Sequence, residues 1–574
     1  MDIKIEVNNK VIIAKKGETV LSALNRNGFK VPTLCNMKDF TPTGACRMCV
    51  VEVEGREKLV PSCSHLVEEW MKINTHSPRV LSARKTIIEL LLADHPDDCL
   101  YCERNGTCEL QKLAEDLHIR ERKLAGKKKN LKIDKSSPGI IRDPSKCILC
   151  GRCVRVCEEK QTVAAFDFGY RGIKTKIATT FEKPLNYSNC IVCGQCVAVC
   201  PTGALTENVS LSELENMLQH PEKNFVVQYS PAIIPSLIEE FQLKTVRNPA
   251  GLLNATLRKL NFEAVIDTSL GADIVTEHIA GEIILRKNEN NKLPVYSSCC
   301  PSWVLYAEQN HHDLIDQLAP VESPQIISGN ILKSYINKEK KIDYNHIFTV
   351  SIMPCTAKKY ECKRVELTEK GMPSVDMVIT ARELSRLIRM NGIDISNIEP
   401  ETMNEPFDKS SGASKLISIS GGTTEGLIRT LYYKLTKKEF EENKLSVLRG
   451  NKEVKEYQLT VGKDKYGFMV INGFQNIEKH LQEIKQRNDL HFVEVMACTG
   501  GCIGGGGQPR AVDIEIIKNR SKILYETDER ELFRASYKSP GMKYIEENIL
   551  KDVNGKVKKA MIRTSFKRKN VWDE

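Results

Sequence analysis

The chain has 574 residues and a formal net charge of +10, which is enough length for about three or four domains with sizeable cores. It contains no run of eighteen apolar residues, and its first residues lack the basic-then-apolar pattern of a secretory signal, so we expect a cytoplasmic protein without a membrane span. Thiols are kept reduced in that compartment, so metal or redox chemistry explains the 21 cysteines better than a disulfide framework does.

Two basic runs occupy residues 120–135 and 556–569. Charge runs are usually solvated faces, but these would also attract an acidic electron carrier by electrostatic steering. Neither run interleaves aromatic residues for base stacking, so we expect no nucleic acid as a partner.

Residues 1–80 predict a small unit made of a sheet and a helix. Two strands flank an Asn-Asn turn at residues 8–9, and an amphipathic helix ends at Gly28. Four cysteines follow at C-x10-C-x2-C-x13-C spacing and supply the thiolates that a 2Fe-2S cluster needs: Cys35, Cys46, Cys49 and Cys63. The first loop is longer than in the plant-type spacing, and zinc is the alternative occupant.

Residues 81–126 carry one histidine and three cysteines at H-x3-C-x2-C-x5-C spacing, namely His95, Cys99, Cys102 and Cys108. A lone histidine is more often a core or surface residue than a ligand. Here three thiols follow within thirteen residues, and a cluster with three thiolates needs a fourth donor, so we predict a 4Fe-4S cluster. A histidine ligand should alter the charge and the potential of that cluster.

Residues 127–209 contain the strongest motif, a C-x2-C-x2-C-x3-C run that occurs twice. This repeat predicts two 4Fe-4S clusters in a bacterial-ferredoxin fold, in which the fourth cysteine of each run binds the other cluster. One cluster is then expected to take Cys147, Cys150, Cys153 and Cys200. The other is expected to take Cys157, Cys190, Cys193 and Cys196.

From residue 210 onward, apolar strand-like runs alternate with helical patterns, which indicates parallel βαβ units. Ligands of such folds gather beyond the carboxyl ends of the strands. Three cysteine-bearing loops follow three of these strands, at residues 296–301, 352–358 and 494–509. The last loop sets two cysteines in a glycine-rich run, whose backbone can pass very close to a bulky group. We expect four of these thiolates to hold a further iron-sulfur centre between two lobes, and Cys362 to be an ordinary thiol.

The three loops together closely resemble the signature segments of the iron-iron (FeFe) hydrogenases: S-C-C-P, M-P-C-x2-K-x2-E and E-x-M-A-C-x3-C-x2-G-G-G-Q-P. The N-terminal cysteine patterns match the large, multi-cluster members of that family. The resemblance implies an anaerobic, monomeric enzyme that reversibly reduces protons to hydrogen, with ferredoxin or a similar small acidic electron carrier and hydrogenase maturation proteins as partners. It also implies an H-cluster, in which a 4Fe-4S cubane is joined to a diiron unit carrying CO, cyanide and azadithiolate, beside one 2Fe-2S and three accessory 4Fe-4S clusters.

Carried over by position, the cubane ligands would be Cys300, Cys355, Cys498 and Cys502, with Cys502 also bridging to the diiron unit. Cys299 would be the first proton relay, and Lys358 would hold a cyanide by a charge-assisted hydrogen bond. Glu361 would orient the loop of Lys358. The resemblance further implies pocket positions for Met353, Met496, Pro231, Pro324 and Gln325.

The expected fold is therefore a multidomain chain of α/β and α+β type. It comprises a β-grasp 2Fe-2S ferredoxin domain at residues 1–80, a 4Fe-4S module with one histidine and three cysteines at residues 81–126, and a two-cluster ferredoxin domain at residues 127–209. The catalytic α/β domain, with two lobes and parallel sheets, would follow at residues 210–574.

The proton path departs from the family pattern, which runs from the cysteine through a glutamate, a serine and a second glutamate. In ungapped register, Ile279 and Ala319 stand where the first glutamate and the serine would be, while Glu282 remains. Neither replacement can carry a proton. His278, Glu282 and Arg286 follow at i, i+4 spacing on one helix face. Our hypothesis is that water or His278 replaces the missing relay, and a surface salt-bridge stripe is the alternative.

The pocket also departs from the family pattern at residues 230–232, where Ser-Pro-Ala stands for Ala-Pro-Ser, and at Ile417, near an expected aromatic residue. These changes indicate a divergent subgroup. A hydrogen sensor or a low-activity homologue therefore stays open as an alternative.

Two other classes compete with the enzyme. The N-terminal cysteine patterns are also similar to those of electron-transfer subunits, such as the large iron-sulfur subunit of respiratory complex I, which lack the three C-terminal loops. An iron-sulfur assembly factor related to the hydrogenases keeps the cubane ligands without a diiron unit. The presence of Cys299, Met353 and Lys358 speaks against that class.

Overall fold

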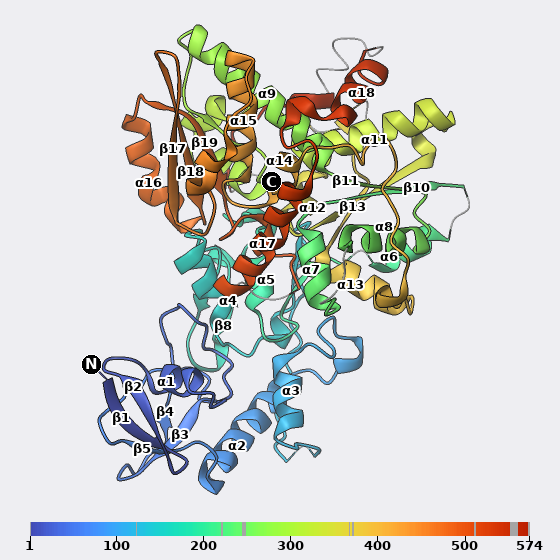
Figure 1. Ribbon diagram of the computed structural model, residues 1–574. Coiled ribbons are helices and arrows are strands. Elements are labelled where there is room, and N and C mark those ends of the chain that lie inside the picture. Colours follow the sequence, from blue (N-terminus) through green and yellow to red (C-terminus); the bar gives the residue numbers. More distant parts are fainter. Residues whose placement is uncertain are drawn as a thin grey trace.

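The computed structural model describes all residues except 1, 122, 210, 220–221, 244–247, 365, 367, 370–371, 510–512, 552–560 and 572–574. The domains at residues 1–209 extend from one end of a two-lobed C-terminal domain, with the N-terminal sheet farthest from it (Figure 1). Within the described ranges, no helix has both the length and the apolar character needed to cross a membrane.

The N-terminal unit is a five-stranded sheet in the order β2-β1-β5-β3-β4. Its strands are β1 (Asp2–Val7), β2 (Lys10–Lys15), β3 (Val50–Val53), β4 (Val60–Pro61) and β5 (Lys72–Asn74). Asn8 and Asn9 form the β1–β2 turn with φ of 49° and 65°, a left-handed conformation that asparagine tolerates. Helix α1 (Val20–Arg26) is capped by the Thr19 side chain and packs on the sheet. The predicted hairpin and helix are thus confirmed.

Two helices join this unit to the next one. Helix α2 (Pro78–Asp94) begins with a proline after the Ser77 cap and ends at His95, and α3 (Glu109–Asp116) follows the third cysteine of the module. The buried Arg84 of α2 donates to the carbonyl oxygens of Met48 and Val50 at 3.1 and 2.8 Å. These bonds tie α2 to the N-terminal sheet.

The domain that follows has two similar halves, as the cysteine repeat predicts. Helix α4 (Arg152–Arg155) and helix α5 (Gln195–Val199) each start after a glycine at φ 73°, and a two-stranded antiparallel sheet joins β6 (Ile140–Arg142) to β9 (Leu205–Glu207). The hairpin of β7 (Asp167–Gly169) and β8 (Lys176–Ala178) lies between the halves.

The first lobe of the C-terminal domain is built on a parallel sheet in the order β11-β10-β13-β16. The strands are β10 (Asn224–Tyr229), β11 (Ala264–Asp267), β13 (Ile347–Met353) and β16 (Met377–Thr380). The helices of this lobe are α6 (Leu211–Leu218), α7 (Ile233–Glu240), α8 (Pro249–Lys259), α9 (Ser269–Asn288), α11 (Pro324–Lys340), α12 (Ala357–Glu361) and α13 (Ala381–Met390), and a short β14 (Thr368–Glu369) and β15 (Met372–Pro373) hairpin follows α12.

The second lobe has a sheet in the order β12-β19-β18-β17. Strands β12 (Val295–Tyr296) and β18 (Asp464–Asn472) run parallel to β19 (Leu490–Met496), but β17 (Val454–Val461) is antiparallel to β18. The expectation of parallel sheets therefore fails at this edge, because Gly462 at φ 62° allows a tight hairpin there. Its helices are α10 (Pro301–Asn310), α15 (Gly422–Thr436) and α16 (Gln475–Gln486), and α14 (Gly412–Lys415), α17 (Ile514–Arg530) and α18 (Pro540–Asn548) complete the domain.

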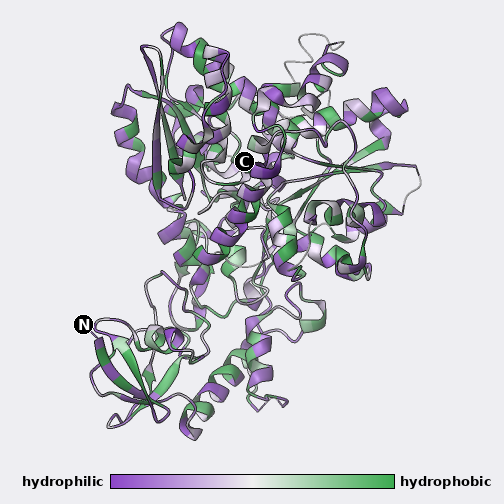
Figure 2. Cartoon of the chain, viewed as in Figure 1, coloured by the Kyte–Doolittle hydropathy of each residue, from purple (hydrophilic) through white to green (hydrophobic). Residues whose placement is uncertain are grey.

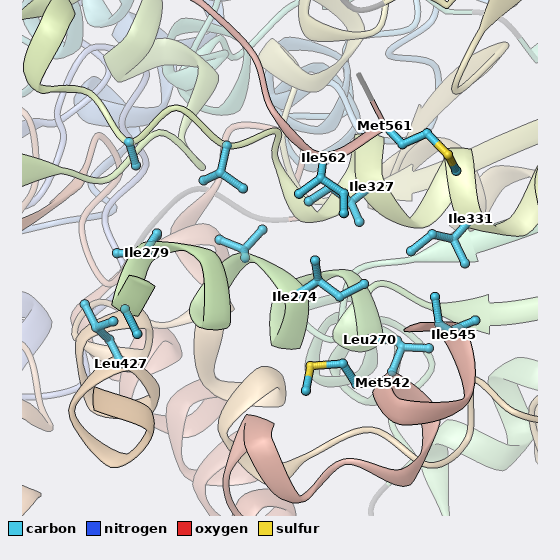
Figure 3. Close-up of a cluster of buried hydrophobic side chains, with 14 of the residues drawn as sticks. Leu270, Ile274, Ile279, Ile327, Ile331, Leu427, Met542, Ile545, Met561 and Ile562 are labelled. Carbon is cyan, nitrogen blue, oxygen red and sulfur yellow. The ribbon is translucent and has the colours of Figure 1, made fainter. Parts of the chain in front are cut away.

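The largest apolar core is built around α9 and combines residues of both lobes. Apolar residues lie along the strands of both sheets, and polar residues lie on the outer helices (Figure 2). The last described segment also joins this core, because Met561 and Ile562 pack near Ile327 of α11 (Figure 3). This core therefore joins the two lobes behind Cys299, which packs against it.

Candidate active site and cluster sites

Four buried or half-buried cysteines from three loops meet between the lobes. Cys300 precedes α10, Cys355 follows β13, and Cys498 and Cys502 follow β19. Their thiols interact electrostatically with one another, and burial together with Cys300 raises the pKa of Cys355 to about 11. Four thiol donors around one buried space are a suitable ligand set for an iron-sulfur cluster.

The glycine-rich loop passes between two other segments. A Cβ atom at Gly505 would lie 2.2 Å from the Pro354 carbonyl oxygen, and one at Gly506 would lie 2.2 Å from that of Cys193. The predicted close approach is therefore made to protein backbone on both sides. It brings the loop against the turn that carries Cys193 and against the end of β13.

Hydrogen bonds from buried side chains hold this loop in place. Arg382 donates to the carbonyl oxygens of Gly506 and Gln508 at 2.5 and 2.6 Å, and Arg520 donates to that of Ile503 at 2.7 Å. The Gln508 amide reaches the Cys502 carbonyl oxygen at 3.3 Å. The loop is thus held by a side chain of α13, by a side chain of α17 and by a hydrogen bond between two of its own residues.

Lys358 and Glu361 form a buried ion pair on α12. Lys358 Nζ lies 2.8 Å from Glu361 Oε2 and donates to the Cys299 carbonyl oxygen at 3.3 Å. Burial by itself would lower the pKa of Lys358, but the Glu361 carboxylate raises it above its usual value. Ser323 and Gln325 donate to the same Glu361 oxygen at 2.8 and 3.1 Å. The ammonium is therefore held charged and oriented toward Cys299.

The remaining predicted pocket residues are also buried. Met353 and Met496 are 3% and 5% exposed, and Pro231 and Pro324 lie at the starts of α7 and α11. Burial raises the pKa of the Cys299 thiol to about 12, although Lys358 opposes the shift. The thiol is thus kept protonated at neutral pH.

The second cysteine run of the dicluster domain lies directly against this site. The thiols of Cys157, Cys190, Cys193 and Cys196 interact electrostatically with one another. Gln195 donates from Nε2 to Cys498 Sγ at 3.2 Å and to the Gly504 carbonyl oxygen at 2.9 Å. One side chain therefore bridges the two cysteine sets.

The other cysteines of the repeat gather around a separate space. A cavity of about 50 Å³ is lined by three cysteines of the first run and the last cysteine of the second run: Cys147, Cys150, Cys153 and Cys200. This is the crossed grouping that the repeat predicts.

The histidine-containing module at residues 81–126 touches the same domain. Arg104 donates to the Cys200 carbonyl oxygen at 2.7 Å, and a Cβ atom at Gly203 would lie 2.6 Å from Cys102 Sγ. His95 is 9% exposed, and its Nδ1 is 3.1 Å from the Pro96 carbonyl oxygen, whereas its buried Nε2 has no hydrogen-bond partner. An unpartnered buried nitrogen of this kind fits a metal ligand.

The cysteines of the N-terminal domain lie near both the dicluster domain and the histidine-containing module. The Cys35 amide donates to Cys46 Sγ at 3.3 Å, and the Cys49 and Cys63 thiols interact directly. Arg155 of α4 donates to the Cys35 carbonyl oxygen and to that of Thr41. Cys46 and Cys108 pack against a common apolar cluster.

The expected proton side is apolar at two positions. Ile279 and Ala319 are 1% and 0% exposed and belong to the core around α9, where Ile279 lies near Leu427 (Figure 3). Glu282 is buried and pairs with Arg286 Nε at 2.8 Å and with Arg563 at 3.5 Å. The i, i+4 pair is thus buried, and the alternative of a surface stripe is wrong for these two residues.

His278 is half-buried and has partners of its own. Its role as a substitute relay stays a prediction.

Of the basic run at 556–569, residues 556–560 lie outside the described part of the chain. In the rest of that run, Lys569 Nζ lies 3.4 Å from the buried carboxylate of Glu308.

Three residues of the site were missed from sequence: Gln195, Arg382 and Glu322. Gln195 and Arg382 act on loops more than a hundred residues away, and no local spacing marks them. Glu322 stands two residues before Pro324 in an ordinary loop sequence. What distinguishes Glu322 is its burial, which depends on residues far away in sequence.

Comparisons with known proteins decide between the classes. A family model described as the iron-only hydrogenase large subunit, C-terminal domain, matches residues 223–506. The chain is also 37% identical over 550 residues, with 94% of each chain covered, to the NADP-reducing hydrogenase subunit HndD of Solidesulfovibrio fructosivorans.

The chain belongs to the iron-only, or FeFe, hydrogenase family.

The hydrogenase is 34% identical to Iron hydrogenase 1 of Clostridium pasteurianum, with 95% of this chain and 96% of the relative covered. It also matches a solved structure of a variant of the FeFe hydrogenase HydA1 from Chlamydomonas reinhardtii at 28% identity and a TM-score of 0.56, over 63% of this chain and all of that one. The accessory part matches three models: a 2Fe-2S iron-sulfur cluster binding domain (1–78), the NADH-ubiquinone oxidoreductase-G iron-sulfur binding region (84–123) and a 4Fe-4S dicluster domain (146–204).

The hydrogenase is thus an oxidoreductase that acts on hydrogen, with iron-sulfur clusters of 2Fe-2S and 4Fe-4S type and the H-cluster of its family. The alternatives of a sensor and of an electron-transfer subunit without a diiron site are not favoured. The domain boundaries stay predictions.

Proposed function

We propose that this hydrogenase binds its H-cluster through Cys300, Cys355, Cys498 and Cys502, with Cys502 also bridging to the diiron unit. The observation that carries the proposal is the convergence of these four thiols beside the buried Lys358–Glu361 pair. When bound, the H-cluster supplies the redox chemistry that interconverts two protons, two electrons and hydrogen. The protein supplies the ligands, a fixed cation and a site without bulk water.

The surrounding residues have separate tasks. Lys358 is oriented to donate a charge-assisted hydrogen bond to a cyanide ligand, and Glu361 keeps it charged. Cys299 holds a proton on its thiol beside the site. The wall of the pocket is formed by Met353, Met496, Pro231, Pro324 and Gln325.

Electrons are relayed through one 2Fe-2S cluster and three accessory 4Fe-4S clusters with the ligand sets given by the cysteine patterns. Gln195 supports electron transfer from the set containing Cys193 to the H-cluster, because this side chain lies between Cys193 and Cys196 of that set and is hydrogen-bonded to Cys498. Arg155 and Arg104 attach the 2Fe-2S domain and the histidine-containing module to the dicluster domain at different points. Each of the two modules therefore has its own contact with the dicluster domain.

The external partner is ferredoxin or a similar small acidic carrier, and maturation proteins install the diiron unit in the cytoplasm. One relative is named as a subunit. We propose a monomer, and size-exclusion chromatography of the natively produced protein tests this, because co-elution with other chains would contradict it.

Infrared spectroscopy of the matured protein tests the proposed active site. We expect bands of CO and cyanide ligands, together with hydrogen evolution from a reduced ferredoxin. A matured protein without these bands would contradict the proposal.

A further inference from the structure

Glu322 is a buried carboxyl beside the active site that has no task in the proposed function. It lies in the loop before α11 and is 4% exposed. Its backbone N–H donates to the Ile562 carbonyl oxygen at 2.8 Å, so the last described segment covers it. The Ser298 hydroxyl donates to the Val321 carbonyl oxygen at 3.0 Å, which ties the loop to the residue before Cys299.

Charged groups face Glu322 from α12 and from the residues that follow it. Burial raises the pKa of Glu322 to about 9, and the Glu361 carboxylate adds to the shift. Arg364, Lys358 and the Thr564 side chain oppose it. A carboxyl in this environment carries a proton at neutral pH and can exchange it within reach of the working pH.

A hydrogen-bonded group begins at the residue after Glu322 and ends at the active site. Ser323, the next residue, donates to Glu361 at 2.8 Å, Glu361 pairs with Lys358, and Lys358 donates to the Cys299 carbonyl oxygen. On the outer side, Thr564 lies between the exposed residues Arg563 and Ser565. Polar residues therefore lie next to Glu322 both in the segment that covers it and in the group that ends at Cys299.

The route expected from the family is interrupted by two buried apolar residues. Ile279 and Ala319 lie in the apolar core, and Glu282 is engaged with Arg286 and Arg563. Glu322 is three residues after Ala319 in the same loop. A titratable side chain is thus present near the position where the family's hydroxyl is missing.

We propose that Glu322 relays protons between solvent and the Ser323–Glu361–Lys358 group beside Cys299, in place of a route past Ile279 and Ala319. In each passage the O–H bond of the Glu322 carboxyl breaks as its proton moves to the Ser323 hydroxyl oxygen, while the hydroxyl proton of Ser323 moves to the Glu361 carboxylate. A new O–H bond forms on Glu322 when its carboxylate takes a proton from solvent. No electron is transferred in this step. The inference rests on the proposed active site.

The test is the isosteric Glu322→Gln substitution in the full-length, matured protein. We expect turnover to fall by about 10²-fold and the pH dependence of the remaining rate to change, because the titrating group is lost. Glu282→Gln should reduce turnover less, and Glu289→Gln, at an exposed position after α9, should leave it unchanged. Dithionite reduction of the accessory clusters, followed by electron paramagnetic resonance, should be the same in all variants.

A second readout needs no turnover. Infrared difference spectra of the protein without its diiron unit should show a protonated carboxyl band at neutral pH that is absent in Glu322→Gln and present in Glu282→Gln. Unchanged rate and pH profile in Glu322→Gln, a larger loss in Glu282→Gln, or no difference in the carboxyl band would each overturn the relay. CO and cyanide bands of the matured wild type report on the proposed active site separately, so a failure there is distinguishable.

Discussion

The electron side and the proton side of this active site differ in how far they keep the pattern of the family. On the electron side the cysteine runs keep their spacing, and Gln195 connects the last accessory set to Cys498. On the proton side Ile279 and Ala319 are part of an apolar core. Cluster ligands are constrained by metal geometry, whereas a proton needs only a continuous series of titratable groups. The supply of electrons and the supply of protons can therefore change independently within one fold.

The largest effect is expected at Cys502, for which we propose the role of a ligand to both parts of the H-cluster. Cys502→Ser should abolish hydrogen production and remove the CO and cyanide bands, since a hydroxyl is a poor substitute for a bridging thiolate. Cys362→Ser is the matched control, because the Cys362 thiol only approaches the Lys359 carbonyl oxygen at 3.4 Å. Infrared spectra with activity assays measure both variants. Full activity of Cys502→Ser would contradict the ligand assignment.

The next effect concerns the missing relay. Adding Ile279→Glu and Ala319→Ser to the Glu322→Gln variant should recover about tenfold in turnover, because proton carriers then occupy the route of the family. The new carboxyl replaces a core side chain, so we expect a loss of about 1–3 kcal/mol in stability. Hydrogen evolution and thermal unfolding measure the two quantities. No recovery in a folded triple variant would show that the apolar core is not the obstacle.

A smaller effect is expected on the electron side. Gln195→Leu removes the hydrogen bond to Cys498 Sγ. A hydrogen bond of this kind to a charged group is worth about 1.5–3 kcal/mol, and it stabilises the reduced cluster because that form is the more negative one. The reduction potential of the cubane should therefore fall, and carrier-driven turnover should fall several-fold. A redox titration followed by electron paramagnetic resonance measures the potential. Gln317→Leu, which loses bonds to the Leu293 and Pro294 carbonyl oxygens, is the control and should leave the potential as it is.

The last effect is on stability and not on turnover, and it depends on pH. Folding raises the pKa of Glu322 from 4.5 to about 9, so its neutral form stabilises the fold fully below pH 4.5, and this contribution is lost as the pH rises toward 9. The loss is at most about 1.4 kcal/mol per pH unit. Glu322→Gln should therefore unfold at a higher temperature than the wild type near pH 8 and nearly the same temperature near pH 4.5. A constant difference between the two across this range would contradict the raised pKa.

The grouping of the cysteines in space could largely be predicted from sequence, because their short spacings are fixed by local chain geometry. The crossed grouping of Cys200 with the first cysteine run is an example, and its cavity is present in the fold. The parallel order of β10, β11 and β13 likewise follows from alternating apolar runs.

The contacts that connect domains could not be predicted in this way. Gln195 and Cys498 are 303 positions apart, and nothing in either motif indicates that they meet. The glycine-rich loop was expected to approach a cluster, but its glycines also make room for the backbone at Cys193 and Pro354. The burial of Glu322 depends on the segment at Ile562, which comes from the other end of the domain.

Hydrogen–deuterium exchange between D2 and water most directly tests whether the supply of electrons and the supply of protons are separate. This reaction needs the active site and a proton route but no external electrons. Mass spectrometry should show that Gln195→Leu keeps the exchange rate while losing carrier-driven turnover, and that Glu322→Gln loses exchange. Wild-type exchange in Glu322→Gln, or equal losses in both assays for Gln195→Leu, would contradict the separation.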